Sequence, residues 1–339
     1  MRGLPLDDVR FEPSMDSFVG AAQGALRAMG EELPADAAWG LSGLAFGAQV
    51  HRTLAPEGLF PRAWDVTYTK VMERFGYGCI AGLRDFFYTE DDISLLRSGW
   101  MRNIRKHLDE GLPAIAFGLH GPAFGIVHGF DEDKEAYLVS TRFDGHKDEP
   151  VHVNDLGLVD PPRVFVLIPT GSLSKYDRAA AAREALREAP ALLAGKQAED
   201  APPVPPDLAV GPDACEAWAA ALEARRVTPP WGAAYTAAYY VEARTNAAAF
   251  LRRAAKAWLP QLAPGLEEAA LDMDRQARGL EALAGLFPVR EPEALENPGR
   301  IAEARKLLNG LRAEMAVSQR RLERLGQQLA PPPEPTKEA

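Results

Sequence analysis

The spacing of apolar residues changes in character near residue 172. Before this point, segments with apolar residues three and four positions apart, which is the helical spacing, precede short apolar runs bounded by Gly and Pro, which are typical of strands. After it, only the helical spacing continues. Helices followed by strands indicate an α+β domain with an antiparallel sheet at residues 1–172, and we expect an all-α helical domain at residues 173–330.

The segments of the first domain are bounded by residues that begin or end regular structure. Asp16 stands where a capping side chain begins the first helix, and Gly76 follows the third. Helices are expected at about 17–30, 38–51, 64–75 and 91–110, and strands at about 77–88, 113–119, 123–130, 135–141 and 163–169.

The second domain has the pattern of a helical bundle. Helices are expected at about 174–194, 213–226, 231–258, 264–286 and 298–329. Residues 195–212 are Pro-rich and polar, which predicts a linker or long loop. The last helix carries a narrow apolar stripe, which favours packing within the bundle over an extended coiled coil. The tail at 331–339 is expected to be disordered.

The amino-acid composition excludes several classes of binding partner for this protein. The 339 residues are 47% hydrophobic and 25% charged with a net charge of −10, as in an ordinary folded protein. Because no Lys or Arg cluster interrupts this acidity, we expect no nucleic-acid partner. The sequence shows neither a signal peptide nor an apolar membrane span, so no membrane partner is expected. The chain has two cysteines, Cys79 and Cys215, which are too few for a disulfide framework or a zinc site. We therefore expect a cytoplasmic protein with no metal and no cofactor.

Several segments carry a more specific signal. In the first domain they are SFVGAAQGALRAMG (17–30), WGLSGLAFGAQVH (39–51), the pair Trp64-Asp65, and FGIVHGFDED (124–133). In the second they are ACEAWAAALEA (214–224), WGAAYTAAYYVEARTNAAAFLRRA (231–254) and LEALAGLFPV (280–289). Together these segments resemble the domain family named after butirosin biosynthesis protein H, with the helical segment that often follows it. The resemblance spans residues 14–329 and implies a papain-like fold related to the C39 peptidases.

The resemblance also implies a chemistry. The namesake of the family is an acyltransferase that moves a γ-glutamylated amino acid from a carrier-protein thioester onto an aminoglycoside amine. In related peptidases a thiolate at a helix N-terminus is activated by a histidine that opens a strand. At these two positions the present chain has Ser17 and Ala123. A serine hydroxyl gains less than a thiol from the helix dipole, so Ser17 requires a base within hydrogen-bond reach.

Other elements of the papain-type site are also replaced. Phe11 stands where a glutamine contributes to the oxyanion hole, and the strand after residue 134 lacks the Asn or Asp that orients the base. His128 is five positions from Ala123, and strand alternation predicts that it points to the opposite face. His120, on the Gly/Pro turn before the strand, is the remaining candidate base. We therefore name Ser17 and His120 as catalytic candidates, and Asp16, Ala123, His51, Trp64 and Asp65 as pocket candidates.

Each candidate also has a structural interpretation. Asp16-Ser17 is a favourable helix start, and His128 beside Gly129 is typical of a buried core histidine. His51 complements the dipole if it ends the expected helix at 38–51. Cys79 and Cys215 are expected to pack as small apolar residues. Four aromatic residues have helical spacing that favours a core stripe over a ligand cage: Tyr235, Tyr239, Phe250 and Trp258.

Three hypotheses follow for function. The first is an acyl or aminoacyl transferase, or an amide or thioester hydrolase, that uses Ser17 with His120 and receives its substrate from an acyl carrier protein. The second is a pseudoenzyme that binds a small amine or acyl compound between the two domains without turnover. The third is a structural protein that forms a homodimer through the last helix. We favour a fold shared with acyltransferases in which the thiol chemistry has been lost.

Overall fold

The computed structural model describes residues 2–3, 9–61, 63–85, 90–143, 149–159, 163–196 and 203–329. The chain forms two compact units. The first, here called the sheet unit, comprises Met1–Ala38 and Pro61–Arg178, and the second, the helical unit, comprises Trp39–Phe60 and Ala179–Ala339. Helices and antiparallel sheets occur together, so the expected α+β class is confirmed.

The sheet unit is built on antiparallel strands. In the described residues the strand order is β3-β8-β4-β5-β6-β7, with β1 pairing β5 in addition. The expected strands are all present, and β1 and β7 are short strands that no apolar run predicted. Their bounds are β1 Arg2–Gly3, β3 Tyr77–Asp85, β4 Ala114–Phe117, β5 Phe124–Asp131, β6 Ala136–Ser140, β7 Val151–His152 and β8 Arg163–Ser172.

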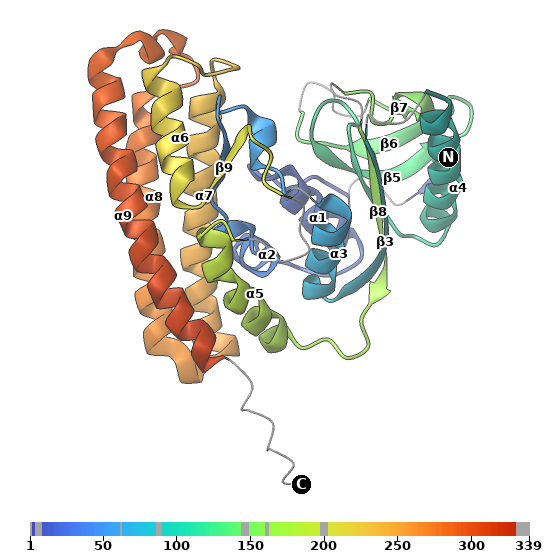
Figure 1. Ribbon diagram of the computed structural model, residues 1–339. Coiled ribbons are helices and arrows are strands. Elements are labelled where there is room, and N and C mark those ends of the chain that lie inside the picture. Colours follow the sequence, from blue (N-terminus) through green and yellow to red (C-terminus); the bar gives the residue numbers. More distant parts are fainter. Residues whose placement is uncertain are drawn as a thin grey trace. The chain divides into compact units, whose positions relative to one another are not determined.

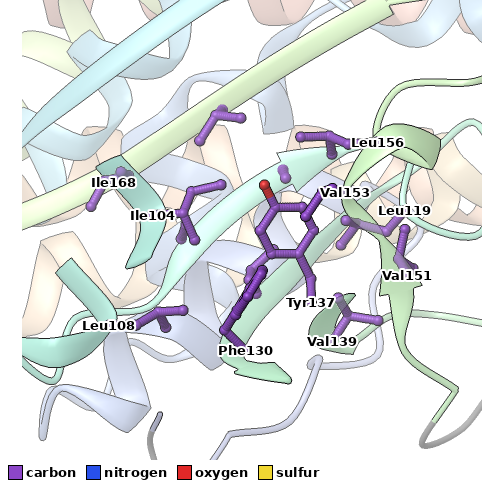
Figure 2. Close-up of a cluster of buried hydrophobic side chains, with 14 of the residues drawn as sticks. Ile104, Leu108, Leu119, Phe130, Tyr137, Val139, Val151, Val153, Leu156 and Ile168 are labelled. Carbon is purple, nitrogen blue, oxygen red and sulfur yellow. The ribbon is translucent and has the colours of Figure 1, made fainter. Parts of the chain in front are cut away.

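Helices cover both faces of this sheet (Figure 1), with α1 (Ser17–Ala28) and α3 (Trp64–Phe75) on one side and α4 (Glu90–Asp109) on the other. The α4 face buries Ile104 and Leu108 with Phe130 and Tyr137, whose rings lie next to each other in Figure 2. The opposite face is aromatic and includes Phe165 of β8. Because both faces are buried, the strands read as continuous apolar runs and not as alternating ones.

Glycines in α1 allow the helix to lie unusually close to its neighbours. A Cβ added at Gly24 would lie 2.0 Å from the carbonyl oxygen of Arg10 and 2.6 Å from Cδ1 of Ile126 in β5. A Cβ at Gly20 would lie 2.3 Å from the carbonyl oxygen of Glu12. The small residues of this helix therefore set its distance from the sheet, and through that distance the position of its first residue, Ser17.

The helical unit is a bundle in which α6–α9 lie side by side (Figure 1). The apolar stripe of α9 packs inside it, with Leu308, Met315, Leu322 and Leu325 buried, so this stripe is occupied within the chain. The helices are α5 Arg178–Leu193, α6 Pro212–Glu223, α7 Gly232–Arg253, α8 Ala263–Leu286 and α9 Pro298–Gln328, with a π-helical turn at Ala254–Trp258. The tail at 331–339 lies outside the described residues.

Two sequence predictions were wrong in this unit. In place of the expected helix at 38–51 the chain forms α2 (Ala35–Ser42), which ends where Gly43 adopts a left-handed φ of 79°. The chain then continues to the strand β2 (Gln49–His51). That strand pairs antiparallel with β9 (Leu208–Val210), which lies in the expected linker at 195–212. The helical unit therefore contains a two-stranded sheet and is not all-α.

Candidate active site

The candidate site is built on the first turn of α1. Asp16 caps the helix: its Oδ1 accepts hydrogen bonds from the backbone N–H groups of Phe18 (2.9 Å) and Val19 (3.1 Å). Asp16 and Ser17 are each 2% exposed. The carboxylate thus satisfies two amides that would otherwise be unpaired at the helix start, and its charge lies at the positive end of the helix dipole.

Ser17 contacts the beginning of β5. Its Oγ accepts a hydrogen bond from the backbone N–H of Phe124, with 3.1 Å between Ser17 Oγ and Phe124 N. Ala123, the residue just before the strand, is 6% exposed. The positions that the family resemblance assigns to nucleophile and base therefore lie at one junction between α1 and β5, and this junction is buried.

The candidate base has another partner. Nε2 of His120 lies 3.0 Å from the backbone carbonyl oxygen of Glu149, so this nitrogen carries the proton and donates it. Among the described residues, no histidine, lysine or carboxylate lies within hydrogen-bond distance of the Ser17 hydroxyl. The described residues therefore provide no side-chain base that could accept the Ser17 proton.

The orientation of His128 is not determined by strand alternation. The pairing of β5 with β6 shifts between Val127 and Gly129, so that His128 is the extra residue of a β-bulge. Its side chain is buried, at 1% exposure, as expected for a core histidine. The expectation that it points away from Ser17 assumed a regular strand and stays a prediction.

Phe124 lies in an aromatic cluster on this face of the sheet. Trp64, the first residue of α3, is 1% exposed, and its ring centroid lies 5.1 Å from that of Phe124. The guanidinium of Arg163 stands over the Trp64 ring at 4.3 Å. Asp65 is exposed, so of the predicted pair only Trp64 contributes to the packing around the junction.

Tyr68 is a member of this cluster that sequence reasoning missed. Its ring stacks on Phe18 with centroids 3.7 Å apart, and no group among the described residues makes a hydrogen bond to its buried hydroxyl. Burial, and after it the charge of Asp16, raises the pKa of Tyr68, while Arg163 lowers it. The signal was present in the sequence, since Tyr68 is four residues after Trp64 and so shares its helix face.

His51 belongs to the helical unit. It lies in β2 and not at a helix end, so the predicted complement to a helix dipole was wrong. Its Nδ1 accepts a hydrogen bond from the backbone N–H of Thr53 at 3.1 Å, and its Nε2 lies 3.3 Å from Oδ2 of Asp207. These contacts fix the turn after β2.

The aromatic stripe of α7 packs largely into the core of the helical unit. Tyr239 is 4% exposed and contacts Trp39, and the fully buried Phe250 contacts Phe46 and Trp258. These contacts agree with the core interpretation of the stripe.

Metal ligands, membrane-spanning helices and known relatives add few constraints on the function. In the described ranges, no three His, Cys, Asp or Glu side chains are grouped as metal ligands would be. No described helix has both the length and the apolar character needed to span a bilayer. No protein-family model matches the chain, and no curated protein has a significantly similar sequence.

Proposed function

We propose that this chain is a papain-like protein related to the butirosin biosynthesis protein H acyltransferases, in which acyl transfer has been lost. It would bind a small amine or acyl compound without turnover. This proposal combines the sequence resemblance with the chemistry of the α1–β5 junction.

The observation that carries the proposal is the environment of the Ser17 hydroxyl. A serine nucleophile requires a general base at about 2.6–3.2 Å and an open side from which a carbonyl carbon approaches. Ser17 instead accepts a hydrogen bond from the Phe124 amide and is 2% exposed. The hydroxyl is used as a structural link between a helix and a strand.

The experiment compares turnover and binding in the same samples. The full chain is incubated with an aminoacyl N-acetylcysteamine thioester and an aminoglycoside amine, and thioester loss and amide formation are followed by chromatography. We expect wild-type protein and the Ser17→Ala variant to match the buffer rate. Saturation-transfer NMR is expected to detect binding of the thioester or the amine to both proteins.

An enzymatic outcome would be distinct. Thioester consumption above the buffer rate that disappears in Ser17→Ala would restore Ser17 as a nucleophile and favour the transferase or hydrolase hypothesis. If neither turnover nor binding is detected, the proposal that the protein binds a small amine or acyl compound is contradicted.

A further inference from the structure

The strand β3 forms one edge of the antiparallel sheet in the sheet unit. Of the described strands, only β8 pairs with it. The segment Tyr77–Leu83 contains no charged residue and no proline, and these are the residues that usually protect an edge strand from pairing with another chain. Ile80, in the middle of this segment, is 43% exposed. The edge therefore has the character of a surface that pairs with a further strand.

The hydrogen-bond pattern of the sheet shows which backbone groups of β3 face the open side. In antiparallel pairs, residues that bond to a given neighbour alternate with residues that do not. The N–H of Gly118 donates to the carbonyl of Ala123 at 3.0 Å and so continues the β4–β5 pairing. Counting back from Gly118, Ile115 directs its backbone groups away from β5 and onto Leu167 of β8. Leu167 thus bonds to β4, and the backbone groups of its other neighbour, Ala81 of β3, point to the open side.

Cys79 has the same orientation as Ala81. It lies two positions earlier in the strand, and it pairs in register with Pro169, which has no N–H to donate. Outside the sheet, the described residues offer the backbone groups of Cys79 and Ala81 no hydrogen-bond partner. The open edge therefore presents two donors and two acceptors, at the spacing that a further antiparallel strand requires.

The sequence around Ile80 is nearly symmetrical, since it reads Gly78-Cys79-Ile80-Ala81-Gly82. If two copies pair antiparallel about a twofold axis at Ile80, each Cys79 lies opposite an Ala81 of the other copy, and all the open backbone groups are satisfied. The two Ile80 residues then face each other with Cα atoms about 4.5 Å apart. Gly78 lies opposite Gly82, so no side chain beside the axis competes with the Ile80 pair for space.

The face that carries Ile80 is the apolar face covered by α4. Ile80 and Gly82 are two positions apart and so share a face, and Trp100 of α4 packs against Gly82, where an added Cβ would lie 2.4 Å from its Cζ2. Trp100 is itself a partly buried neighbour of the hydrophobic core on this side of the sheet. Contact between two Ile80 side chains would extend that core across the axis.

We propose that two copies of this chain form a dimer by antiparallel pairing of their β3 edges about Ile80. Each copy presents the same groups to the other, as a twofold interface requires. The surface differs from the last helix, whose apolar stripe is buried within the bundle of its own chain. The proposal involves only the sheet unit, and it does not depend on whether Ser17 reacts or a small molecule binds.

Sedimentation velocity of the full chain tests the dimer. We expect the mass to rise reversibly with protein concentration from one chain to two. Ile80→Lys places two ammonium groups face to face at the axis and should weaken dimerisation by about tenfold or more. Leu271→Lys makes the same change at a position in α8 that is 53% exposed, and should leave dimerisation unchanged. If the wild-type chain stays single at every concentration, the edge is left to a strand of another protein, and the proposal is wrong.

A covalent test determines the register and remains informative if Ile80→Lys does not fold. In the double variant Cys79→Ala with Ile80→Cys, the two thiols at position 80 lie within the reach of a disulfide. Mild oxidation should then yield a linked dimer on a non-reducing gel. The control Cys79→Ala with Leu271→Cys should stay single under the same conditions. Equal cross-linking of the two variants, or no cross-linking at position 80, would contradict pairing about Ile80.

Discussion

The hydroxyl of Ser17, the first residue of α1, accepts a hydrogen bond from the backbone amide of Phe124, the first residue of β5. In the papain-like family that the sequence resembles, a helix N-terminus carries the nucleophile and the start of a strand carries the base. Here a buried hydrogen bond joins Ser17 to Phe124, the residue after Ala123, which stands at the predicted base position. This hydrogen bond gives Ser17 a structural role that requires no catalysis. Variants at Ser17 and around it can distinguish this role from a catalytic one.

Removal of this hydroxyl should lower stability. Ser17→Ala removes the side-chain acceptor of the buried Phe124 N–H, and we expect a loss of about 1–3 kcal/mol of the free energy of unfolding. Urea denaturation measures this loss, and Ser174→Ala at an exposed position serves as the control, with an expected change within about 0.5 kcal/mol. A variant Ser17→Ala as stable as wild type would show that the hydrogen bond contributes nothing.

Removal of the Tyr68 hydroxyl, in contrast, should not lower stability. Because it is buried without a partner among the described residues, Tyr68→Phe is expected to be neutral or stabilising. Tyr176→Phe is the contrast, since the Tyr176 hydroxyl donates to the carbonyl oxygen of Arg74 at 2.7 Å and its loss should cost about 1 kcal/mol. Thermal unfolding of both variants tests the pair. A clear loss of stability in Tyr68→Phe would mean that its hydroxyl has a partner.

Tyr68 also predicts a dependence on alkaline pH. Its pKa in the folded chain is raised above the ordinary value of 10.0, chiefly by burial, so the phenol stays protonated while the unfolded chain ionises. The unfolded state then binds fewer protons than the folded state, and stability falls as the pH rises above 10.0. Tyr68→Phe should lose less stability than wild type over this range. Equal losses in the two proteins would contradict the assignment to Tyr68.

The sequence was informative where local patterns determine structure. Asp16 before an apolar helix predicted the cap that the structure shows, and the Trp64–Phe75 helix was predicted with the observed bounds. The antiparallel sheet followed from apolar runs bounded by Gly and Pro. These features depend on residues within one or two turns of each other, which is the range over which propensities and spacing act.

The errors arose where a distant partner decides the outcome. Gln49 pairs with Val210, and neither segment has enough local signal to predict a three-residue strand. His120 and Glu149 are likewise brought together by the fold, so no spacing rule predicted that this carbonyl would engage the candidate base. The bulge at His128 breaks the alternation on which its predicted orientation depended. Strand register and loop closure depend on tertiary contacts, which a single sequence predicts poorly.

The spacing between α1 and its neighbours predicts a strong effect of one methyl group. Gly24→Ala places a Cβ 2.0 Å from the Arg10 carbonyl oxygen, so the helix must shift, and we expect a loss of about 1–3 kcal/mol. Gly99→Ala is the control in the same unit, because nothing lies within 4 Å of its added Cβ in α4. It should gain about 0.5–1 kcal/mol from helix propensity. Destabilisation of both variants alike would show that the close approach is not responsible.

The two cysteines should react slowly with iodoacetamide in the native protein. Burial raises the pKa of the half-buried Cys79 thiol, partly opposed by a hydrogen bond from Thr69. Burial raises the pKa of Cys215 to about 12, although Arg244 and Arg312 oppose it. Because the thiolate is the reactive form, alkylation should be slow at neutral pH and rise sharply in urea, with Cys215 the slower of the two. Fast stoichiometric labelling of native Cys79 would make it the leading catalytic candidate.

The central claim is that Ser17 is structural and forms no acyl-enzyme. Its most direct test is the intact mass of the native full chain after incubation with an aminoacyl thioester and, separately, with a serine-directed fluorophosphonate. The account predicts an unchanged mass with both reagents, equal to that of Ser17→Ala treated in parallel. A stoichiometric adduct that maps to the peptide containing Ser17, and that is absent from Ser17→Ala, would contradict it.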